Sequence, residues 1–156
     1  MPRQLGIKEA KQRAGRFCAF RERSPNELLE KLMDLGVGGN DAEKLVIELT
    51  KENFVNEQPF ANAYCNDKFE FNSWGKQKIK ANIYSHKLST SALENALDRI
   101  DPTKYEARLF ELAGKKWNKL ERDETNKRKQ KTLSYLASKG YEMDLIWKCI
   151  NKLDED

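Results

Sequence analysis

Side chains that could do chemistry are few and scattered in this chain. The single histidine, His86, has no cysteine, aspartate or second histidine at metal-ligand spacing, so we interpret it as a satisfied core or interface residue. Acidic pairs such as Asp41/Glu43 and Asp123/Glu124 fit helix starts and loops, with no sign of the dry pocket that acid–base catalysis requires. The sequence contains neither type of glycine-rich phosphate loop. We therefore predict a protein that is not an enzyme and uses no cofactor or metal.

The cysteines and the apolar segments bear on the cellular compartment. Cys18, Cys65 and Cys149 are odd in number, far apart and on apolar helix faces, which favours reduced, buried thiols over a disulfide framework. No stretch approaches the roughly 20 apolar residues that span a bilayer. Residues 1–6 also lack the apolar core of a signal peptide. We expect a cytoplasmic protein that does not enter a membrane.

Basic and acidic residues are segregated along the 156-residue chain, although its net charge is only +4. Residues 1–21 hold six basic residues and one acidic residue, whereas residues 22–57 hold four and nine. Residues 68–87 hold five lysines and one glutamate, and residues 115–131 hold eight basic and three acidic residues. Such basic runs fit an anionic partner, which they would attract over about a Debye length.

The basic run in the middle of the chain has a coherent geometry. If Ile79 points inward, a helical wheel places Lys76, Lys80 and Lys87 on one flank of the apolar face, next to Trp74. This stripe suits a phosphate backbone or an acidic protein surface, but phosphate contacts do not read base sequence. The alternative is a solvated helix face whose lysine stems cover apolar surface.

A second basic run covers residues 127–131, Lys-Arg-Lys-Gln-Lys, and follows a predicted loop at residues 121–126. It could be a solvated helix start. However, cations at a helix N-terminus oppose the macrodipole, which slightly favours a binding role.

These candidate residues lie on helices that repeat along the chain. Three copies of one pattern, an apolar helical stripe followed by a short break, peak at residues 32–37, 83–88 and 136–141, a period of roughly 50 residues. No segment shows the period-two alternation of a strand. The chain is therefore predicted to be all-α, with nine helices in three three-helix repeats at residues 1–54, 55–100 and 101–156.

Capping residues mark the predicted helix boundaries. The sharpest signal is Ser24-Pro25-Asn26-Glu27, an N-cap followed by proline at the first helical position and glutamate at the third. The other predicted N-caps are Asn40 or Asp41, Asn56, Ser89 or Ser91, and Asp101. Glycines are predicted to end helices at Gly36 and Gly140.

Aromatic and apolar residues at helical spacing are predicted to face the core. Phe60, Tyr64 and Phe71 are expected on one side of a single helix, and Met143 on the inner stripe of the last helix. The aromatic residues interpreted as core rather than as a stacking platform are Phe17, Phe60, Tyr105 and Trp147.

Three segments, in order, resemble motifs of one family. Residues 23–28, Arg-Ser-Pro-Asn-Glu-Leu, are similar to (Arg/His)-Ser-x-x-Glu-Leu, and residues 53–61, Asn-Phe-Val-Asn-Glu-Gln-Pro-Phe-Ala, to Gly-Tyr-Leu-(Asp/Asn)-Asp-x-x-Phe-Ala. Residues 74–80, Trp-Gly-Lys-Gln-Lys-Ile-Lys, are similar to Gly-x-x-(Arg/Lys)-Ile-x-x-x-Leu. Together they resemble the RecX family of bacterial recombinase regulators, over residues 7–153.

The chain also departs from the family pattern. Lys87 stands where a glycine is common, and the third unit matches only in outline. Lysines replace arginines typical of the middle unit at positions 76, 78 and 80, which keeps the charge but loses the planar, bidentate guanidinium.

The resemblance implies three tandem three-helix, homeodomain-like repeats in an elongated, curved array. It also implies a protein that lodges in the groove of RecA filaments on single-stranded DNA and inhibits RecA ATPase, strand exchange and filament growth, and thereby regulates DNA repair, the SOS response and homologous recombination. Direct contact with the single-stranded DNA is left open. We expect a monomer, because binding in a groove needs no symmetry. The match to the basic middle unit implies that filament contacts come from Lys68, Lys76, Lys78 and Lys80. Charge alone adds Lys127, Arg128 and Lys131 as candidates.

The main alternative is a helix-turn-helix type DNA-binding regulator, because a three-helix unit with a basic helix also describes homeodomain-like readers. Against it, the third helix of the first unit carries Glu43, Glu48 and Glu52, which are poor residues for a major groove.

Overall fold

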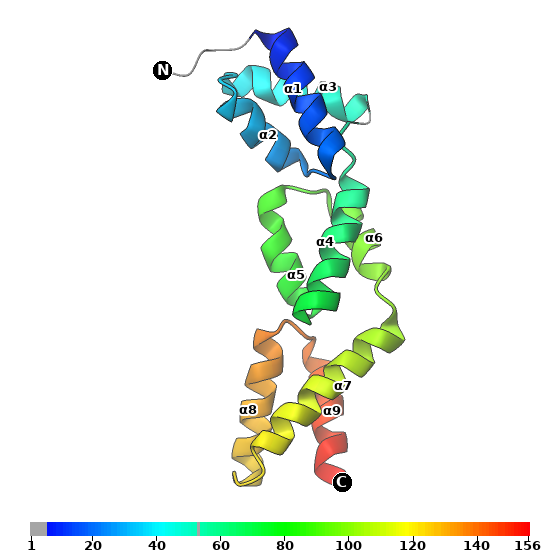
Figure 1. The fold of residues 1–156 in the computed structure, drawn as a ribbon. Coiled ribbons are helices and arrows are strands. Elements are labelled where there is room, and N and C mark those ends of the chain that lie inside the picture. Colours follow the sequence, from blue (N-terminus) through cyan, green and yellow to red (C-terminus); the bar gives the residue numbers. More distant parts are fainter. Residues whose placement is uncertain (1–5, 53) are drawn as a thin grey trace. The chain divides into compact units, whose positions relative to one another are not determined.

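The computed structural model describes residues 6–52 and 54–156. Residues 1–5 of the segment compared with a signal peptide, and Asn53 of one family-like motif, lie outside the described residues. The described residues form nine α-helices and one 3-10 turn with no strand, which confirms the predicted all-α fold class (Figure 1). The elements are α1 (Ile7–Phe20), α2 (Pro25–Asp34), α3 (Gly39–Lys51), α4 (Glu57–Asn72), α5 (Lys76–Ile83), η1 (Tyr84–His86), α6 (Thr90–Asp98), α7 (Pro102–Lys119), α8 (Thr125–Ser138) and α9 (Met143–Glu155).

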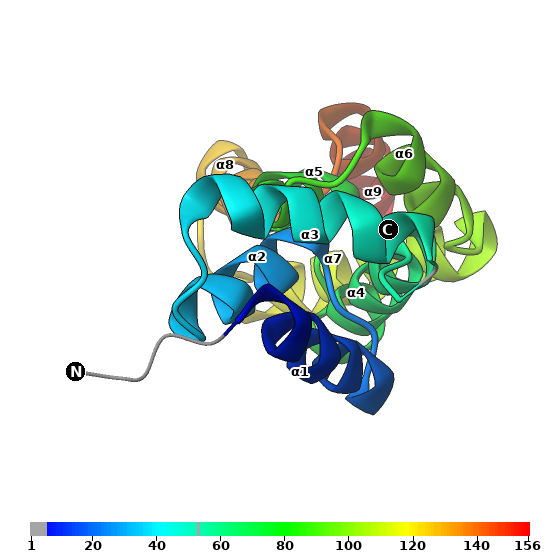
Figure 2. The ribbon, with the colours of Figure 1, turned by 90° about the horizontal axis from the view of Figure 1, so that it is seen from above.

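The chain divides into two compact units. Unit 1 comprises Met1–Tyr64 and Ile83–Ala96, and within it α1, α2 and α3 contact one another pairwise (Figures 1 and 2). Unit 2 comprises Cys65–Asn82 and Leu97–Asp156, and within it α7, α8 and α9 do the same. The repeat boundaries at residues 54 and 100 stay a prediction.

The core of unit 1 is made of small and aliphatic side chains. They come from α1, α2, α3 and the loops after α2 and α3, because each helix has one apolar stripe that it must bury. The core residues are Ala10, Ala14, Cys18, Leu28, Leu32, Val37, Ala42, Leu45, Leu49 and Val55.

Among the described residues, four helical segments are followed by a residue with positive φ. At Gly36, Lys87 and Gly140 the turn is the same, whereas Ser73 N–H bonds to the carbonyl four residues earlier. The backbone φ is 88° at Gly36, 56° at Lys87 and 97° at Gly140, and in each case the N–H bonds to the carbonyl three residues earlier. This confirms the predicted helix-ending glycines. Because L-residues with a Cβ disfavour this conformation, Lys87 occupies a backbone position that suits glycine.

Most of the predicted N-caps are confirmed. Ser24 and Glu27 form a complete capping box. Asn56 Oδ1 accepts from Gln58 N–H at 3.1 Å, and Asp101 Oδ1 accepts from Thr103 N–H at 2.8 Å. Of the two serine alternatives, Ser89 is the cap, since its Oγ accepts from the N–H of residue 92 at 3.2 Å.

The predicted cap of the third helix was wrong. α3 begins at Gly39 after Gly38, whose extended backbone starts the helix without a side-chain cap. Asn40 and Asp41 therefore lie inside the first turn, where the Asp41 carboxylate favours the positive end of the helix dipole.

Three predicted core residues are exposed instead. Phe71 is 81 % exposed, and Phe69, two positions earlier on α4, is the buried ring, because residues two apart do not share a helix face. Met143 is exposed because it is the first residue of α9, ahead of the buried Ile146. Trp147 directly follows the buried Ile146, so it lies on a neighbouring, exposed face of α9.

The other aromatic residues that were predicted to face the core differ in burial. Phe60 and Tyr105 are buried, which confirms them as core, whereas Phe17 and Tyr64 are half-buried. Within residues 6–52 and 54–156, no helix is both long and apolar enough to cross a membrane.

Candidate functional site

The lysine-bearing helix α5 is held at its start by a close backbone contact inside unit 2. Gly75 N–H donates to the Lys139 carbonyl at 2.7 Å, and Gln77 N–H donates to the Gly140 carbonyl at 2.9 Å. A Cβ on Gly75 would lie 2.3 Å from the carbonyl carbon of Gly140, so only glycine allows this approach. The turn after α8 therefore fixes where α5 begins.

A buried tyrosine adds a second anchor. The Tyr105 hydroxyl accepts from Lys76 N–H at 2.9 Å and donates to Glu142 Oε1 at 2.5 Å. Burial, and then the bond to Glu142, raise the pKa of Tyr105 well above its ordinary range, so the hydroxyl keeps its proton. Tyr105 thus ties the first turn of α5 to the residue that precedes α9.

The predicted lysines surround the end of α4 and the start of α5, and we call Lys68, Lys76, Lys78 and Lys80 the lysine site. The Nζ atoms of Lys68 and Lys78 lie 4.9 and 4.7 Å from the centre of the Trp74 ring. Lys76 Nζ lies 5.2 Å from the centre of the Tyr105 ring, and Lys80 is exposed. Cations near an aromatic face are attracted by its quadrupole, so these rings help to orient the ammonium groups.

The predicted stripe of Lys76, Lys80 and Lys87 does not exist as a helical face. α5 ends at Ile83 and gives way to η1, after which Lys87 adopts its left-handed conformation. A 3-10 turn has fewer residues per turn than an α-helix, so the wheel fails beyond Ile83.

The second predicted basic run lies in the first two turns of α8. Arg128 is stacked on the Trp117 ring at 3.9 Å, and its Nε donates to the Trp117 carbonyl at 3.0 Å. Lys131 donates to Asp123 at 2.8 Å and lowers the pKa of that carboxyl, whereas Lys127 is exposed. About 17 Å of helix separates Lys127 from the end of α8, next to the α5 contact at Gly140, so the structure does not bring this run to the lysine site.

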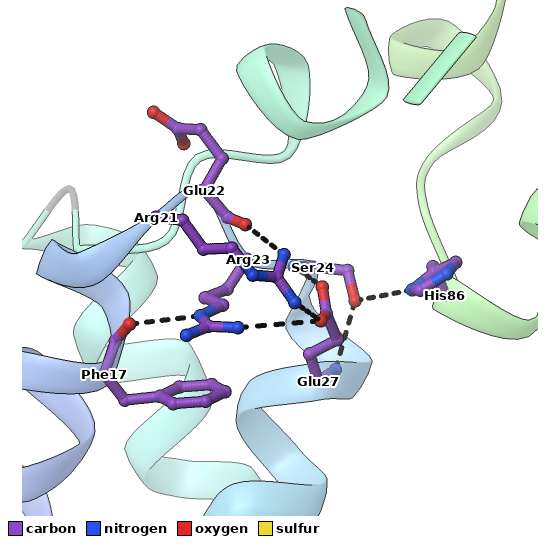
Figure 3. Close-up of polar contacts among 7 residues, drawn as sticks. All are labelled: Phe17, Arg21, Glu22, Arg23, Ser24, Glu27 and His86. Carbon is purple, nitrogen blue, oxygen red and sulfur yellow. Dashed lines mark hydrogen bonds and ion pairs between the residues drawn. The ribbon is translucent and has the colours of Figure 1, made fainter. Parts of the chain in front are cut away.

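Arg128 belongs to a recurring arginine–aromatic contact that was not predicted from the sequence. Arg23 stacks on Phe17 at 3.6 Å and its Nε donates to the Phe17 carbonyl at 3.1 Å, as Arg128 does to Trp117 (Figure 3). Arg108 repeats the arrangement on Phe69, with its Nη1 donating to the Phe69 carbonyl at 3.0 Å. The spacing of the three aromatic residues, about 50 positions, was the available signal.

His86 joins η1 to α2 within unit 1. Ser24 is fully buried, and its Oγ accepts from Glu27 N–H at 3.1 Å and lies 2.9 Å from His86 Nδ1 (Figure 3). The His86 ring also packs against Phe60 and Tyr64. His86 is therefore a satisfied interface residue, as predicted.

The chemistry available to these surfaces is binding through charge. Among the described residues, no group of three or more His, Cys, Asp or Glu side chains could hold a metal ion. Burial raises the pKa of all three thiols, that of Cys65 to about 11, which keeps them protonated near neutral pH. The fold and surfaces together define an all-α protein with clusters of cationic side chains.

Comparison with known proteins shows similarity to one family. Residues 104–150 match the family profile described as the third three-helix domain of RecX. The chain is 29% identical to the regulatory protein RecX of Clostridioides difficile (strain 630), over 93% of this chain and 68% of that protein. It is 34% identical to that of Clostridium perfringens (strain 13 / Type A), over 84% and 62%. The chain is therefore similar to the RecX family of regulatory proteins over most of its length.

Solved structures confirm the fold. The crystal structure of RecX from Lactobacillus salivarius has a TM-score of 0.84 at 21% identity and covers 96% of this chain and 97% of that chain. A second crystal structure of regulatory protein RecX has a TM-score of 0.82 at 17% identity, over 94% and 71%. The chain spans only 62–68% of the length of these two clostridial relatives. The activities of the whole relatives are therefore only proposed for this chain.

Proposed function

We propose that this protein binds RecA recombinase filaments on single-stranded DNA and inhibits RecA ATPase, strand exchange and filament growth. It would thereby regulate DNA repair, the SOS response and homologous recombination. Similarity to proteins named regulatory protein RecX supports a regulatory role. We further propose that the protein acts in the cytoplasm as a monomer. It would inhibit RecA by occupying the filament, without catalysis or a cofactor.

The observation that carries the proposal is the way the lysine site is held. Gly75 and Tyr105 fix the start of α5, and the ammonium groups of Lys68 and Lys78 lie 4.9 and 4.7 Å from the centre of the Trp74 ring. Cations on a fixed backbone lose less conformational entropy on binding than cations on a mobile loop. A preorganised cationic surface suits a nucleoprotein filament, whose phosphates and acidic side chains are both anionic.

The contacts of α3 disfavour the helix-turn-helix alternative. Glu48 and Glu52 accept from Lys11 at 2.7 and 2.9 Å, so this third helix directs acidic side chains to α1. A recognition helix instead offers donors and cations to base edges.

Binding to preformed RecA filaments on single-stranded DNA tests the proposal. The double variant Lys78→Glu/Lys80→Glu should bind about ten-fold more weakly or worse, because two attractive contacts become repulsive. The matched control, Lys104→Glu/Lys119→Glu, makes the same charge change at exposed positions of α7 and should bind like the wild type. Equal binding by the two doubles would remove the lysine site from the interface.

The salt dependence separates DNA contact from RecA contact. If the lysine site touches phosphates, affinity for the filament should fall by about 0.7 log units per log unit of salt for each neutralised phosphate. A slope that is unchanged in Lys78→Glu/Lys80→Glu would place these lysines on RecA rather than on DNA.

A further inference from the structure

A second cationic surface lies in unit 1, outside every predicted site. A pocket of about 440 Å³ opens between α1 and α2. No acidic side chain lines it, and the residues that matter to its chemistry are Arg13, Arg16, Phe17, Phe20, Arg23 and Lys31. Four cations and two aromatic rings therefore surround one hollow.

The pocket follows from helical spacing on α1. Arg13, Arg16, Phe17 and Phe20 are related as i, i+3, i+4 and i+7, which places them on one face. Lys31 reaches the same pocket from α2, with its Nζ 5.5 Å from the centre of the Phe17 ring. The pocket thus gathers charge from two helices that pack directly against each other.

Arg23 and Phe17 build one wall. The Arg23 side chain is only 10% exposed, and it is held by the stacking on Phe17 and the bond to the Phe17 carbonyl (Figure 3). Desolvation lowers the pKa of Arg23, whereas its nearest carboxylate, Glu27, acts in the opposite direction from 4.0 Å. This fixed, partly desolvated cation would attract an anion more strongly than an exposed one.

The rim cations are available for a ligand. Arg16 has no hydrogen bond or ion pair among the described residues, and Arg13 pairs only with Glu9, at 3.3 Å in an exposed i,i+4 contact. Such an exposed ion pair contributes little free energy, so a phosphate could displace it. Guanidinium groups bind phosphate oxygens in a bidentate manner.

An exposed ring beside these cations indicates the kind of anion. Phe20 is 84% exposed, although it lines the same pocket. Single-stranded nucleic acids combine phosphates with unpaired bases that stack on aromatic side chains. Bases in a duplex are already stacked and paired, so they would leave Phe20 unused.

We infer that this pocket of unit 1 binds single-stranded nucleic acid, with Arg13, Arg16 and Lys31 on backbone phosphates and one base on Phe20. This site lies outside the lysine site and requires no RecA. It therefore goes beyond the proposed function and can fail independently of it.

The test measures fluorescence anisotropy of the full chain with labelled oligothymidylate of about 20 nucleotides, longer than typical single-strand sites, without RecA and at about 50 mM salt. Arg16→Glu should weaken binding about ten-fold and reduce the salt slope by about 0.7 or more, because a phosphate contact is lost. The matched control is Lys8→Glu, an exposed charge reversal on another face of α1, which should bind within about two-fold of wild type.

Phe20→Ala tests the stacking. It should weaken binding to oligothymidylate about five-fold or more, and it should leave binding to an abasic oligonucleotide of equal length unchanged. Because Phe20 is exposed, this substitution should not disturb folding, which circular dichroism checks.

Several results would overturn the inference. They are no binding of wild type to the oligonucleotide, equal weakening by Arg16→Glu and Lys8→Glu, or an equal effect of Phe20→Ala on normal and abasic strands. Tighter binding of polyglutamate than of oligothymidylate would replace the nucleic acid with an acidic protein segment. Loss of oligonucleotide binding in Arg16→Glu while RecA inhibition persists would support two separate surfaces.

Discussion

At the scale of single residues, the left-handed helix ends show how backbone conformation constrains the sequence. Gly36 and Gly140 adopt positive φ without steric conflict, whereas Lys87 does so with a Cβ. The left-handed conformation could be predicted at Gly36 and Gly140, because glycine after an apolar helical stripe is a local signal. The third was readable only by aligning the repeats.

Lys87→Gly should stabilise the protein. A left-handed L-residue costs about 1–2 kcal/mol and the flexibility of glycine offsets part of that, so the free energy of unfolding should rise by about 0.5–1 kcal/mol. Urea denaturation measures it. Lys44→Gly, inside α3, is the control and should destabilise by about 1 kcal/mol. A decrease in stability for Lys87→Gly would mean that its side chain contributes more than its backbone conformation costs.

Because Cys65 is buried, we expect the free energy of unfolding to fall at alkaline pH. Burial raises its pKa from 9.0 to about 11, so folding favours the protonated thiol. The resulting stabilisation is complete below pH 9.0 and disappears as pH rises towards about 11. Two pKa units correspond to roughly 2–3 kcal/mol, measured as the free energy of unfolding from pH 8 to 11.

Cys65→Ala is the control for this pH dependence. Burial also raises the pKa of Tyr105 and Tyr141, so some loss of stability in alkali should remain in this variant. The fall should nevertheless be shallower than in the wild type. Identical pH profiles for the two proteins would show that the Cys65 thiol is not the group being titrated.

At the scale of helices, the arginine–aromatic contacts anchor one element to another. Arg128→Met should lower the free energy of unfolding by about 1–2 kcal/mol, because it removes the bond to the Trp117 carbonyl and the stacking on that ring. The neighbouring Lys127→Met should change it by less than about 0.5 kcal/mol, since Lys127 is exposed. Thermal and urea denaturation compare the two. If Lys127→Met were the more destabilising variant, the assignment of Arg128 as an anchor would be wrong.

Helix positions were predictable because their signals are local. The capping box at Ser24 and the proline after Asp101 lie within one turn of the helices they start. The errors arose where the signal was ambiguous or long-range. Asn40 has a typical capping side chain, but Gly38 is the N-cap of α3. Phe69 and Phe71 are both aromatic, so residue type alone did not show which ring is buried.

At the scale of the whole molecule, charge and family motifs could be recognised in the sequence, but the side chains that contact the charged groups could not. The sequence identified the lysines of the lysine site as candidates, and these assignments stay a prediction. It did not indicate that Trp74 and Tyr105 would orient them, because those contacts depend on tertiary packing. The pocket containing Arg16 could not be predicted for the same reason, since Arg23, Lys31 and Leu35 join the α1 residues only in the folded chain.

The sharpest test of RecA inhibition is ATP hydrolysis by RecA on single-stranded DNA with increasing amounts of this protein. Wild type should lower the steady-state rate, Lys78→Glu/Lys80→Glu should need about ten-fold more protein for the same effect, and Lys104→Glu/Lys119→Glu should match wild type. An unchanged RecA rate at protein concentrations equal to RecA would show that the protein does not inhibit RecA.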